Sequence, residues 1–382
     1  MNTVEESLPA GDVEQMAVGA AACAPDQPIS IYEVHLPSWR RVPEEANRSL
    51  TFFEVAPLLA EHARLLNFTH IQLHAPGFTD PAGLRFLIDY LHKQGLCVIL
   101  DNGQYFEAQR PDLEETRLDG ICINSETHMY GYDYKLDLAW AEDTAAYFAT
   151  DPLYRKYHQG LFRRRDGYAF DANHILSLSW RLVNHPRPSL FTIMPGDTWQ
   201  KFSNLRLLYA YMYLLPGKKQ LFMGAEFGQQ NRWQPETSLD WHLLDGRGFH
   251  TRLMNWVAAL NRFYREEQVL HETDFSPAGL QWIDTSDASW SIISFLRQCP
   301  ATGELLLAVL NFTPLPRHNY RVGVPRDGFW TETLNSDAVE YGGSGQGNLG
   351  GLEAAPFGWN FQSHSLMLTL PPLGAIVLKA EL

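Results

Sequence analysis

The sequence predicts a large α/β domain followed by a small antiparallel β domain. Over the first two thirds of the 382 residues, short apolar runs alternate with segments of helical spacing. That alternation is typical of βαβ units, in which helices cover both faces of a parallel sheet. From about residue 280, short alternating runs broken by Gly and Pro take over, as expected for antiparallel strands. The length also exceeds that of one compact core, which favours two domains.

The first elements follow directly from these patterns. ISIYEVHL and FTHIQLHA alternate like strands, and LCVILD is a nearly all-apolar strand that ends in a carboxylate. FFEVAPLLAEHARLL and PAGLRFLIDYLHKQG have helical spacing, and Gly95 is expected to close the second helix. The predicted strands are therefore 29–36, 68–75 and 96–101, and the predicted helices are 52–66 and 81–95.

The pattern resumes after residue 119, where DGICIN indicates another strand. Asp197 is placed to cap the amino terminus of a long helix. The later expected elements are strands at 119–124, 174–180 and 219–224, and helices at 138–149, 197–215 and 252–268. The β domain is expected to use the runs 289–297, 304–313, 319–325 and 364–380.

Composition narrows the function classes. The formal charge of -14 argues against a nucleic-acid surface or an anionic-membrane surface, because both need a basic patch. A neutral partner such as a carbohydrate fits better, and 13% aromatic residues could supply ring faces that stack on sugars. Cys23, Cys97, Cys122 and Cys299 are too widely spaced to indicate a zinc site or a disulfide framework.

No signal peptide or membrane-spanning run is evident, so the sequence predicts a cytoplasmic protein. Residues 1–27, with their scattered small and acidic side chains, are expected to be a disordered leader. The predicted domains are then a barrel over 28–275 and a β-sandwich over 276–382.

In a parallel α/β barrel the chemistry sits at the carboxyl ends of the strands. Each residue there could instead serve only to cap a loop. The side chains at the predicted strand ends are Glu33, His35, His74, Asp101, Asn124, Trp180, Arg181 and Glu226.

Several long segments of the chain carry a resemblance to a known family, among them ISIYEVHLPSWRR, DPLYRKYHQG, MPGDTWQKFSNLR, PGKKQLFMGAEFGQ, SLDWHLLDG and NFTPLPRHNYRVG. Over these segments the chain resembles the bacterial glycogen branching enzymes of the α-amylase superfamily. The resemblance implies a TIM-type barrel with a carboxyl-terminal β-sandwich, and in active members cleavage of an α-1,4-glucan with re-attachment as an α-1,6 branch. A retaining reaction of this kind needs a carboxylate nucleophile and an acid/base carboxyl group, and this superfamily adds a third carboxylate.

The resemblance places the nucleophile motif, D-[AG]-[FIL]-R-[VF]-D, at residues 119–124. Here the Arg position holds Cys122 and the nucleophile position holds Asn124. A carboxamide is essentially non-nucleophilic and cannot stabilise a developing oxocarbenium ion. The family's catalytic nucleophile is therefore expected to be absent.

The other two carboxyl groups are expected to be absent as well. LSWRLVNH matches the family's S-H-D-E motif, so that Trp180 replaces the His and Arg181 replaces the third carboxylate. The chain passes almost directly from the fourth-strand region to the sixth, so the fifth strand and its general acid are expected to be deleted. Glu126 is a remote candidate for the acid.

These features predict a degenerate TIM-type barrel without its fifth strand, followed by an antiparallel β-sandwich, and an inactive accessory protein. We expect it to bind an α-glucan such as glycogen or a maltooligosaccharide, or a partner enzyme of glycogen metabolism, without metal or organic cofactor. An active branching enzyme that pairs Glu126 with Asp133 or Asp101 and a decaying paralogue remain alternatives. The expected glucan-binding residues, which could instead only hold the barrel together, are Tyr32, His35, Asp101, Glu226, Trp233 and Trp241.

Overall fold

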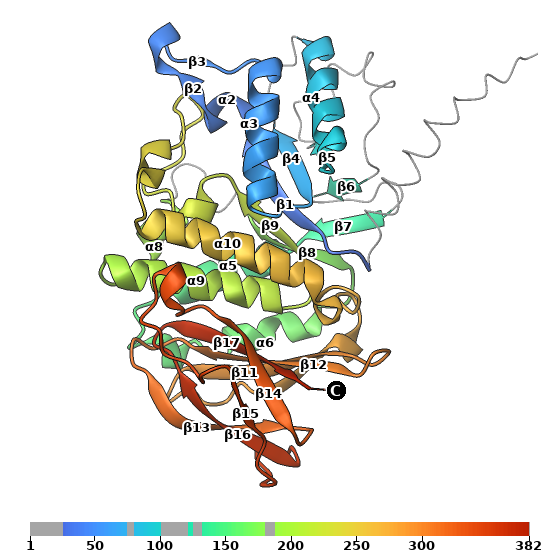
Figure 1. Cartoon of the computed structure of the whole chain (residues 1–382), viewed down its shortest axis with the longest axis vertical. Coiled ribbons are helices and arrows are strands. Elements are labelled where there is room, and N and C mark those ends of the chain that lie inside the picture. Colours follow the sequence, from blue (N-terminus) through green and yellow to red (C-terminus); the bar gives the residue numbers. More distant parts are fainter. Residues whose placement is uncertain (1–25, 75–79, 101–120, 125–131, 180–187, 382) are drawn as a thin grey trace, which may run out of the picture.

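A computed structural model describes residues 26–74, 80–100, 121–124, 132–179 and 188–381 (Figure 1). In this part of the chain, seven parallel strands form one sheet in the order β5-β4-β1-β9-β8-β7-β6. This is the strand order of an α/β barrel opened between β5 and β6. The strands are β1 (Ser30–His35), β4 (His70–His74), β5 (Cys97–Leu100), β6 (Ile121–Asn124), β7 (Tyr132–Leu136), β8 (Asn173–Leu178) and β9 (Lys218–Phe222).

One βα unit is missing between β6 and β7. These strands pair directly, with Asn124 opposite Lys135, and only residues 125–131 join them. A parallel connection normally takes a dozen residues or more. The two outer strands of the sheet nevertheless approach each other, since Cα atoms of β5 and β6 come within 8 Å. The predicted degenerate barrel without a fifth strand is confirmed.

Helices cover the sheet where the periodicity predicts them. Thr51 caps α3 and Asp197 caps α9, each in a capping box with a side chain three residues later. The predicted Asp197 cap is thus confirmed. The longer helices are α3 (Phe52–Leu65), α4 (Pro81–Lys93), α5 (Leu138–Ala149), α9 (Thr198–Leu214) and α10 (Phe249–Glu266). Short elements are α2 (Leu36–Trp39), β2 (Arg41–Val42), β3 (Arg48–Ser49), α6 (Leu161–Arg164) and α8 (Leu190–Ile193).

The carboxyl-terminal domain is an antiparallel sandwich. A six-stranded sheet in the order β10-β11-β12-β17-β14-β15 faces the pair β13-β16, and an apolar cluster fills the space between them. Its strands are β10 (Leu280–Asp284), β11 (Ile292–Cys299), β12 (Glu304–Asn311), β13 (Arg317–Val324), β14 (Phe329–Asn335), β15 (Gly351–Glu353), β16 (His364–Leu370) and β17 (Gly374–Ala380).

Barrel and sandwich share one hydrophobic core. The helices α9 and α10 lie between the barrel strands and the sandwich (Figure 1). The main cluster of buried side chains runs from Val34 and Leu73 of the barrel to Phe295 and Val377 of the sandwich. Among the described residues, no helix is long and apolar enough to cross a membrane.

Most of the predicted leader lies outside the described residues. Its last two residues, Asp26 and Gln27, are described, and both contribute backbone carbonyls to the barrel. The Asp26 carbonyl lies 2.8 Å from Nδ1 of His271, and the Gln27 carbonyl accepts a hydrogen bond of 2.7 Å from the Lys218 ammonium group.

Candidate functional site at the carboxyl ends of the barrel strands

The inner face of the barrel is identified by an isolated apolar cluster. Ile31, Ile99, Tyr134 and Ile175, from four different strands, pack against one another in this cluster. Because side chains alternate along a strand, residues two and four positions after Ile31 point to the same inner side. Glu33 and His35 therefore line the barrel toward its carboxyl end.

A buried polar layer lies above the apolar cluster. The Glu33 carboxylate accepts a hydrogen bond of 2.8 Å from Nε2 of His74 on the neighbouring strand. Nε2 of Gln220 donates to Oε1 of Gln72 over 2.7 Å. Within the described residues, Oγ of Ser177 and Oε1 of Gln220 are buried without a hydrogen-bond partner. The layer thus keeps some unused hydrogen-bonding capacity, which is unusual for buried polar groups.

His35, Ser38 and Trp233 form a cluster at the barrel mouth, called the mouth cluster below. Nδ1 of His35 lies 2.7 Å from the Ser38 hydroxyl, which also accepts a hydrogen bond of 3.0 Å from the Trp233 indole. The Trp233 ring meets the rings of His35 and Phe222 edge-on, with centroids 5.2 and 5.4 Å away. Trp233 therefore lies across the carboxyl ends of β1 and β9, and it is only half-buried.

The His35 imidazole is neutral at ordinary pH. Its pKa is lowered from 6.5 to about 4, mainly by burial and in smaller measure by the nearby His74 and Arg41. A neutral imidazole carries no charge and has one nitrogen that donates and one that accepts, so it can form hydrogen bonds of both kinds with hydroxyl groups. The mouth cluster consequently offers an uncharged, partly aromatic surface.

A small cavity opens beside Trp233, and its lining is also uncharged. Phe191, Phe222 and Leu239 give it apolar walls, while Gln229 and Asn231 add side-chain amides. The hollow has a volume of only about 20 Å³, which leaves room for little more than a water molecule. It is therefore not a ligand pocket by itself, and it adds an uncharged edge to the barrel mouth.

Tyr32 and Glu226 lie away from the mouth, on the outer side of β1. Both are fully buried, and the Tyr32 hydroxyl donates to Oε1 of Glu226 over 2.8 Å. The same carboxylate oxygen lies 3.0 Å from Nε2 of His62 on α3, and the Trp39 indole donates to the Tyr32 hydroxyl over 3.1 Å. Burial first, and then Glu226, raises the pKa of Tyr32 well above its usual value, so the phenol remains a donor. These contacts favour the interpretation that both residues hold the barrel together.

Trp241 extends this group toward the surface. Its indole donates to the Trp39 carbonyl over 2.7 Å, and the Arg40 guanidinium lies over its ring at 4.6 Å. Trp241 is half-buried. Trp241 thus lies next to Trp39 and the buried residues around Tyr32, whereas His35 and Trp233 contact each other at the barrel mouth.

The positions that match the family's catalytic motifs are described only in part. Asn124 is the last residue of β6, and Cys122 lies in the same strand. The predicted positions outside the described residues are Asp101, Glu126, Trp180 and Arg181. Among the residues that are described, no three His, Cys, Asp or Glu side chains are grouped so that they could hold a metal ion.

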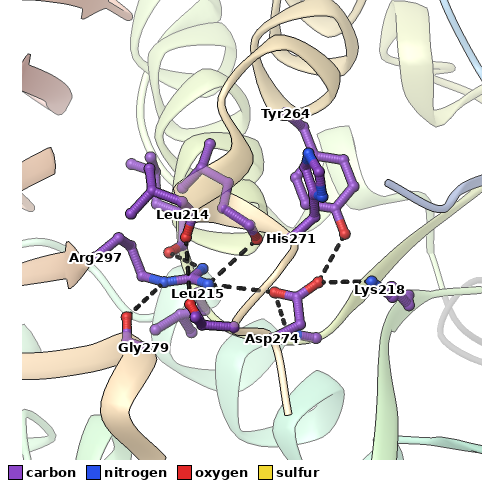
Figure 2. Close-up of polar contacts among 12 residues, drawn as sticks. Leu214, Leu215, Lys218, Tyr264, His271, Asp274, Gly279 and Arg297 are labelled. Carbon is purple, nitrogen blue, oxygen red and sulfur yellow. Dashed lines mark hydrogen bonds and ion pairs between the residues drawn. The ribbon is translucent and has the colours of Figure 1, made fainter. Parts of the chain in front are cut away.

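At the opposite, amino-terminal end of the barrel lies a buried ionic group, called the Asp274 cluster (Figure 2). The Asp274 carboxylate accepts hydrogen bonds from the Tyr264 hydroxyl over 2.8 Å and from the Gly217 backbone over 3.0 Å. It also pairs with the Lys218 ammonium at 3.1 Å and with the Arg297 guanidinium at 3.4 Å. The two cations and the carboxylate are completely buried.

The Asp274 cluster joins three parts of the fold. Lys218 belongs to β9, Tyr264 to α10 and Arg297 to β11 of the sandwich. Burial alone would raise the pKa of Asp274, but the surrounding cations, Lys218 foremost, outweigh it and lower the pKa. Since barrel chemistry is expected at the other end of the strands, we interpret this cluster as structural.

Sequence reasoning missed His62, Ser38 and the Asp274 cluster. Ser38 lies in ISIYEVHLPSWRR and His62 lies in FFEVAPLLAEHARLL, but nothing in either run singles out these two side chains. The cluster had one usable signal, because Lys218 and Lys219 open the buried strand KKQLF. Two buried lysines require an acidic or carbonyl partner, although the sequence does not say which one.

Comparison with known proteins agrees with the fold and the motifs. Residues 282–381 match the family described as alpha amylase, C-terminal all-beta domain. The chain is 36% identical to the 1,4-alpha-glucan branching enzyme GlgB of Aquifex aeolicus, over 97% of this chain and 79% of that protein. It is 35% identical to the GlgB of Aromatoleum aromaticum, over 96% and 78%.

These alignments also show where the chain is shorter. The aligned region with the Aquifex aeolicus protein spans 500 positions, whereas this chain has 382 residues in all, so at least 118 positions of the relative have no counterpart here. Among solved structures, AmyP in complex with maltose is 11% identical with a TM-score of 0.64, over 96% of this chain and 98% of that one. An alpha-amylase from H. orenii gives 14% identity and a TM-score of 0.58, over 92% and 99%.

Proposed function

Because the chain belongs to the 1,4-alpha-glucan branching enzyme family, we propose that it acts in glycogen metabolism as a non-catalytic protein that binds α-glucan. The observation that carries this proposal is Asn124 at the end of β6. The family motif has its nucleophile there, and an amide cannot form the covalent glycosyl intermediate.

The missing βα unit supports the same conclusion. In a retaining enzyme the nucleophile and the acid/base lie about 5 Å apart, and the family's acid ends the fifth strand. Here β6 pairs directly with β7. The nucleophile position therefore holds an amide, and the strand that would carry the acid is absent between β6 and β7.

What remains at the barrel mouth suits binding of a neutral sugar. His35 is uncharged, Trp233 is half-buried, and the side-chain amides of Gln229 and Asn231 lie beside Trp233. Trp241 and Asp101 stay proposed glucan-binding residues on the strength of the family resemblance alone, and Asp101 lies outside the described residues. The maltose-bound AmyP has a related fold, which is compatible with glucan binding but does not by itself assign it.

We further propose that the protein works in the cytoplasm beside an active enzyme of glycogen metabolism, and that its domains divide near residue 275. An active enzyme with replacement groups and a decaying paralogue without function are the competing proposals. An active enzyme would shift the iodine stain of amylose, whereas a decaying paralogue would neither bind glucan nor stay monodisperse.

The test is native-gel electrophoresis of the purified protein with and without glycogen, run beside an iodine-stain assay on amylose. We expect retardation by glycogen and an unchanged stain. A changed stain would overturn the non-catalytic assignment. Unchanged mobility of a folded sample would overturn the glucan-binding assignment.

A further inference from the structure

A rigid hairpin on the sandwich presents three exposed aromatic rings. Residues 355–362, called the aromatic hairpin, lead into β16, which with β13 forms the layer of the sandwich farthest from the barrel (Figure 1). Phe357, Trp359 and Phe361 in this hairpin are 56%, 47% and 107% exposed. Alternate residues thus present rings to solvent, whereas rings of this size are normally buried.

Backbone hydrogen bonds close the hairpin, and the Asn360 side chain fixes it to the sandwich. Trp359 and Gln362 exchange two backbone hydrogen bonds of 3.1 and 2.8 Å, which closes a two-residue turn. Within the turn, Asn360 accepts from the Gly323 backbone over 3.1 Å and donates to Asp284 over 3.1 Å. A side chain at Gly323 would collide with the Trp359 carbonyl, since its Cβ would lie 2.0 Å from that oxygen.

One arginine braces the rings from beneath. The Arg321 guanidinium lies 4.6 Å from the Phe357 ring centroid and 5.9 Å from that of Trp359. It also donates to the Ser365 hydroxyl over 3.0 Å, and that hydroxyl donates to the Phe357 carbonyl over 2.7 Å. Arg321 therefore holds the Phe357 and Trp359 rings in place before any ligand arrives, which reduces the entropy lost on binding, whereas the Phe361 ring extends into solvent.

The turn keeps an aromatic residue where glycine would be less strained. Asn360 and Phe361 both have positive φ angles, 47° and 60°. A two-residue turn of this type favours Asn-Gly, and a bulky side chain at the second position is an outlier. Strain of this kind is retained where the side chain has a use, and the Phe361 ring has no use within the fold because it is fully exposed.

The size of the exposed aromatic surface and the net charge of the chain favour one class of ligand. With about 200 Å² for each aromatic side chain, the three rings expose roughly 400 Å², well below the ~800 Å² that a stable protein partner covers. The net charge of -14 disfavours a nucleic acid. The faces of sugar rings are apolar and flat, and a row of two or three of them matches a surface of this size.

We infer that the aromatic hairpin is a glucan-binding surface, on which successive glucose units of an α-glucan stack against Phe357, Trp359 and Phe361. This inference rests on the proposed function, because it takes the ligand class from the family. It adds a site on the sandwich, remote from the barrel mouth. The hairpin would hold the polymer whether or not the barrel does.

The test compares ring deletions in native gels that contain glycogen. The variants are Trp359→Ala and Phe361→Gly, and the matched control is Trp290→Ala. Trp290 also lies on the sandwich, is 46% exposed and stacks against an arginine, with Arg317 at 4.0 Å, but it is outside the hairpin. Thermal melting of each variant checks that it folds, and Phe361→Gly should melt no lower than the wild type because it relieves the strained turn.

We expect glycogen to retard the wild type and the control alike, and the two hairpin variants to lose affinity by about fivefold or more. If folded hairpin variants are retarded as strongly as the wild type, the inference is wrong while the proposed function stands, with glucan held elsewhere. If glycogen does not retard the wild type, both the inference and the proposed function fail.

Discussion

Replacing Asp274 by Asn is expected to destabilise the whole chain strongly. The substitution keeps the shape of the side chain but removes the negative charge between two buried cations, Lys218 and Arg297. Breaking a buried ion pair by removing one partner typically costs about 3–5 kcal/mol, because the remaining charge stays uncompensated. Total stabilities of about 5–15 kcal/mol are usual, so Asp274→Asn should lose a large share of the free energy of unfolding.

The assay is urea unfolding followed by tryptophan fluorescence. Asp143→Asn is the matched control, since Asp143 pairs with Arg164 at 2.8 Å in a pair whose side chains are 28% and 63% exposed. That pair should contribute less than about 1 kcal/mol. Tyr264→Phe supplies an intermediate step and should lose about 1.5–3 kcal/mol, because it removes a hydrogen bond to a buried carboxylate.

The cluster also predicts acid sensitivity. The folded-state pKa of Asp274 lies below its usual 3.8, so its contribution is complete at higher pH and is lost as the pH falls below about 4. Asp274→Asn should lack this component of acid unfolding. The reasoning is refuted if Asp274→Asn unfolds within about 1 kcal/mol of Asp143→Asn at neutral pH.

Three further changes test the site and the strained turn. Asn124→Asp alone should give no branching activity, because we propose that the family's acid and third carboxylate are absent as well, and any change in iodine stain contradicts this. For His35, whose folded pKa of about 4 lies below the ordinary 6.5, the contribution to stability is full above pH 6.5 and is lost toward pH 4. As the pH falls between those values, the free energy of unfolding of the wild type should drop by on the order of 2 kcal/mol more than that of His35→Asn, with allowance for the partial exposure of the ring. Equal dependence of the two unfolding free energies on pH would falsify this. Phe361→Gly should raise the free energy of unfolding by about 1 kcal/mol in the same urea assay, and a decrease would show that the turn is not strained.

Most of the fold could be predicted from the sequence because the local signals within each element agree with one another. Helices α3 and α9 combine apolar spacing with a capping box, and each lies within two residues of its predicted bounds. The alternating run at β4 and the apolar run at β5 are likewise unambiguous. β7 was not predicted, because YDYKL mixes charged and aromatic residues and owes its place to the neighbouring strands.

The contacts of the site were less accessible to sequence reasoning. Tyr32 and Glu226 were both named, yet their hydrogen bond joins residues 194 positions apart and no local pattern reveals it. The pairing of Lys218 with Asp274 spans 56 positions. The strain at Phe361 depends on the turn geometry, and the residues WNFQ do not predict that turn, because its usual sequence signal is Asn-Gly.

The proposed losses of the nucleophile and the acid have one geometric origin. In a retaining enzyme the nucleophile and the acid must face each other across the scissile bond, so they come from neighbouring strands. Removal of the βα unit between β6 and β7 takes away the strand that carries the acid, and a nucleophile at Asn124 would then have no partner. The strands β1, β4 and β9 on the other side of the barrel keep their polar layer and the mouth cluster.

The strained turn at Asn360 and Phe361 distinguishes the hypothesis of an accessory protein from that of a decaying paralogue. A chain without any selected activity has no reason to keep a fully exposed ring at a backbone position where glycine would relieve strain. A glucan-binding accessory has such a reason, because the ring enlarges the stacking surface. If Phe361→Gly makes the protein more stable and at the same time weakens its retention by glycogen, stability has been exchanged for binding at that position. That combination is not expected from inheritance of the fold alone.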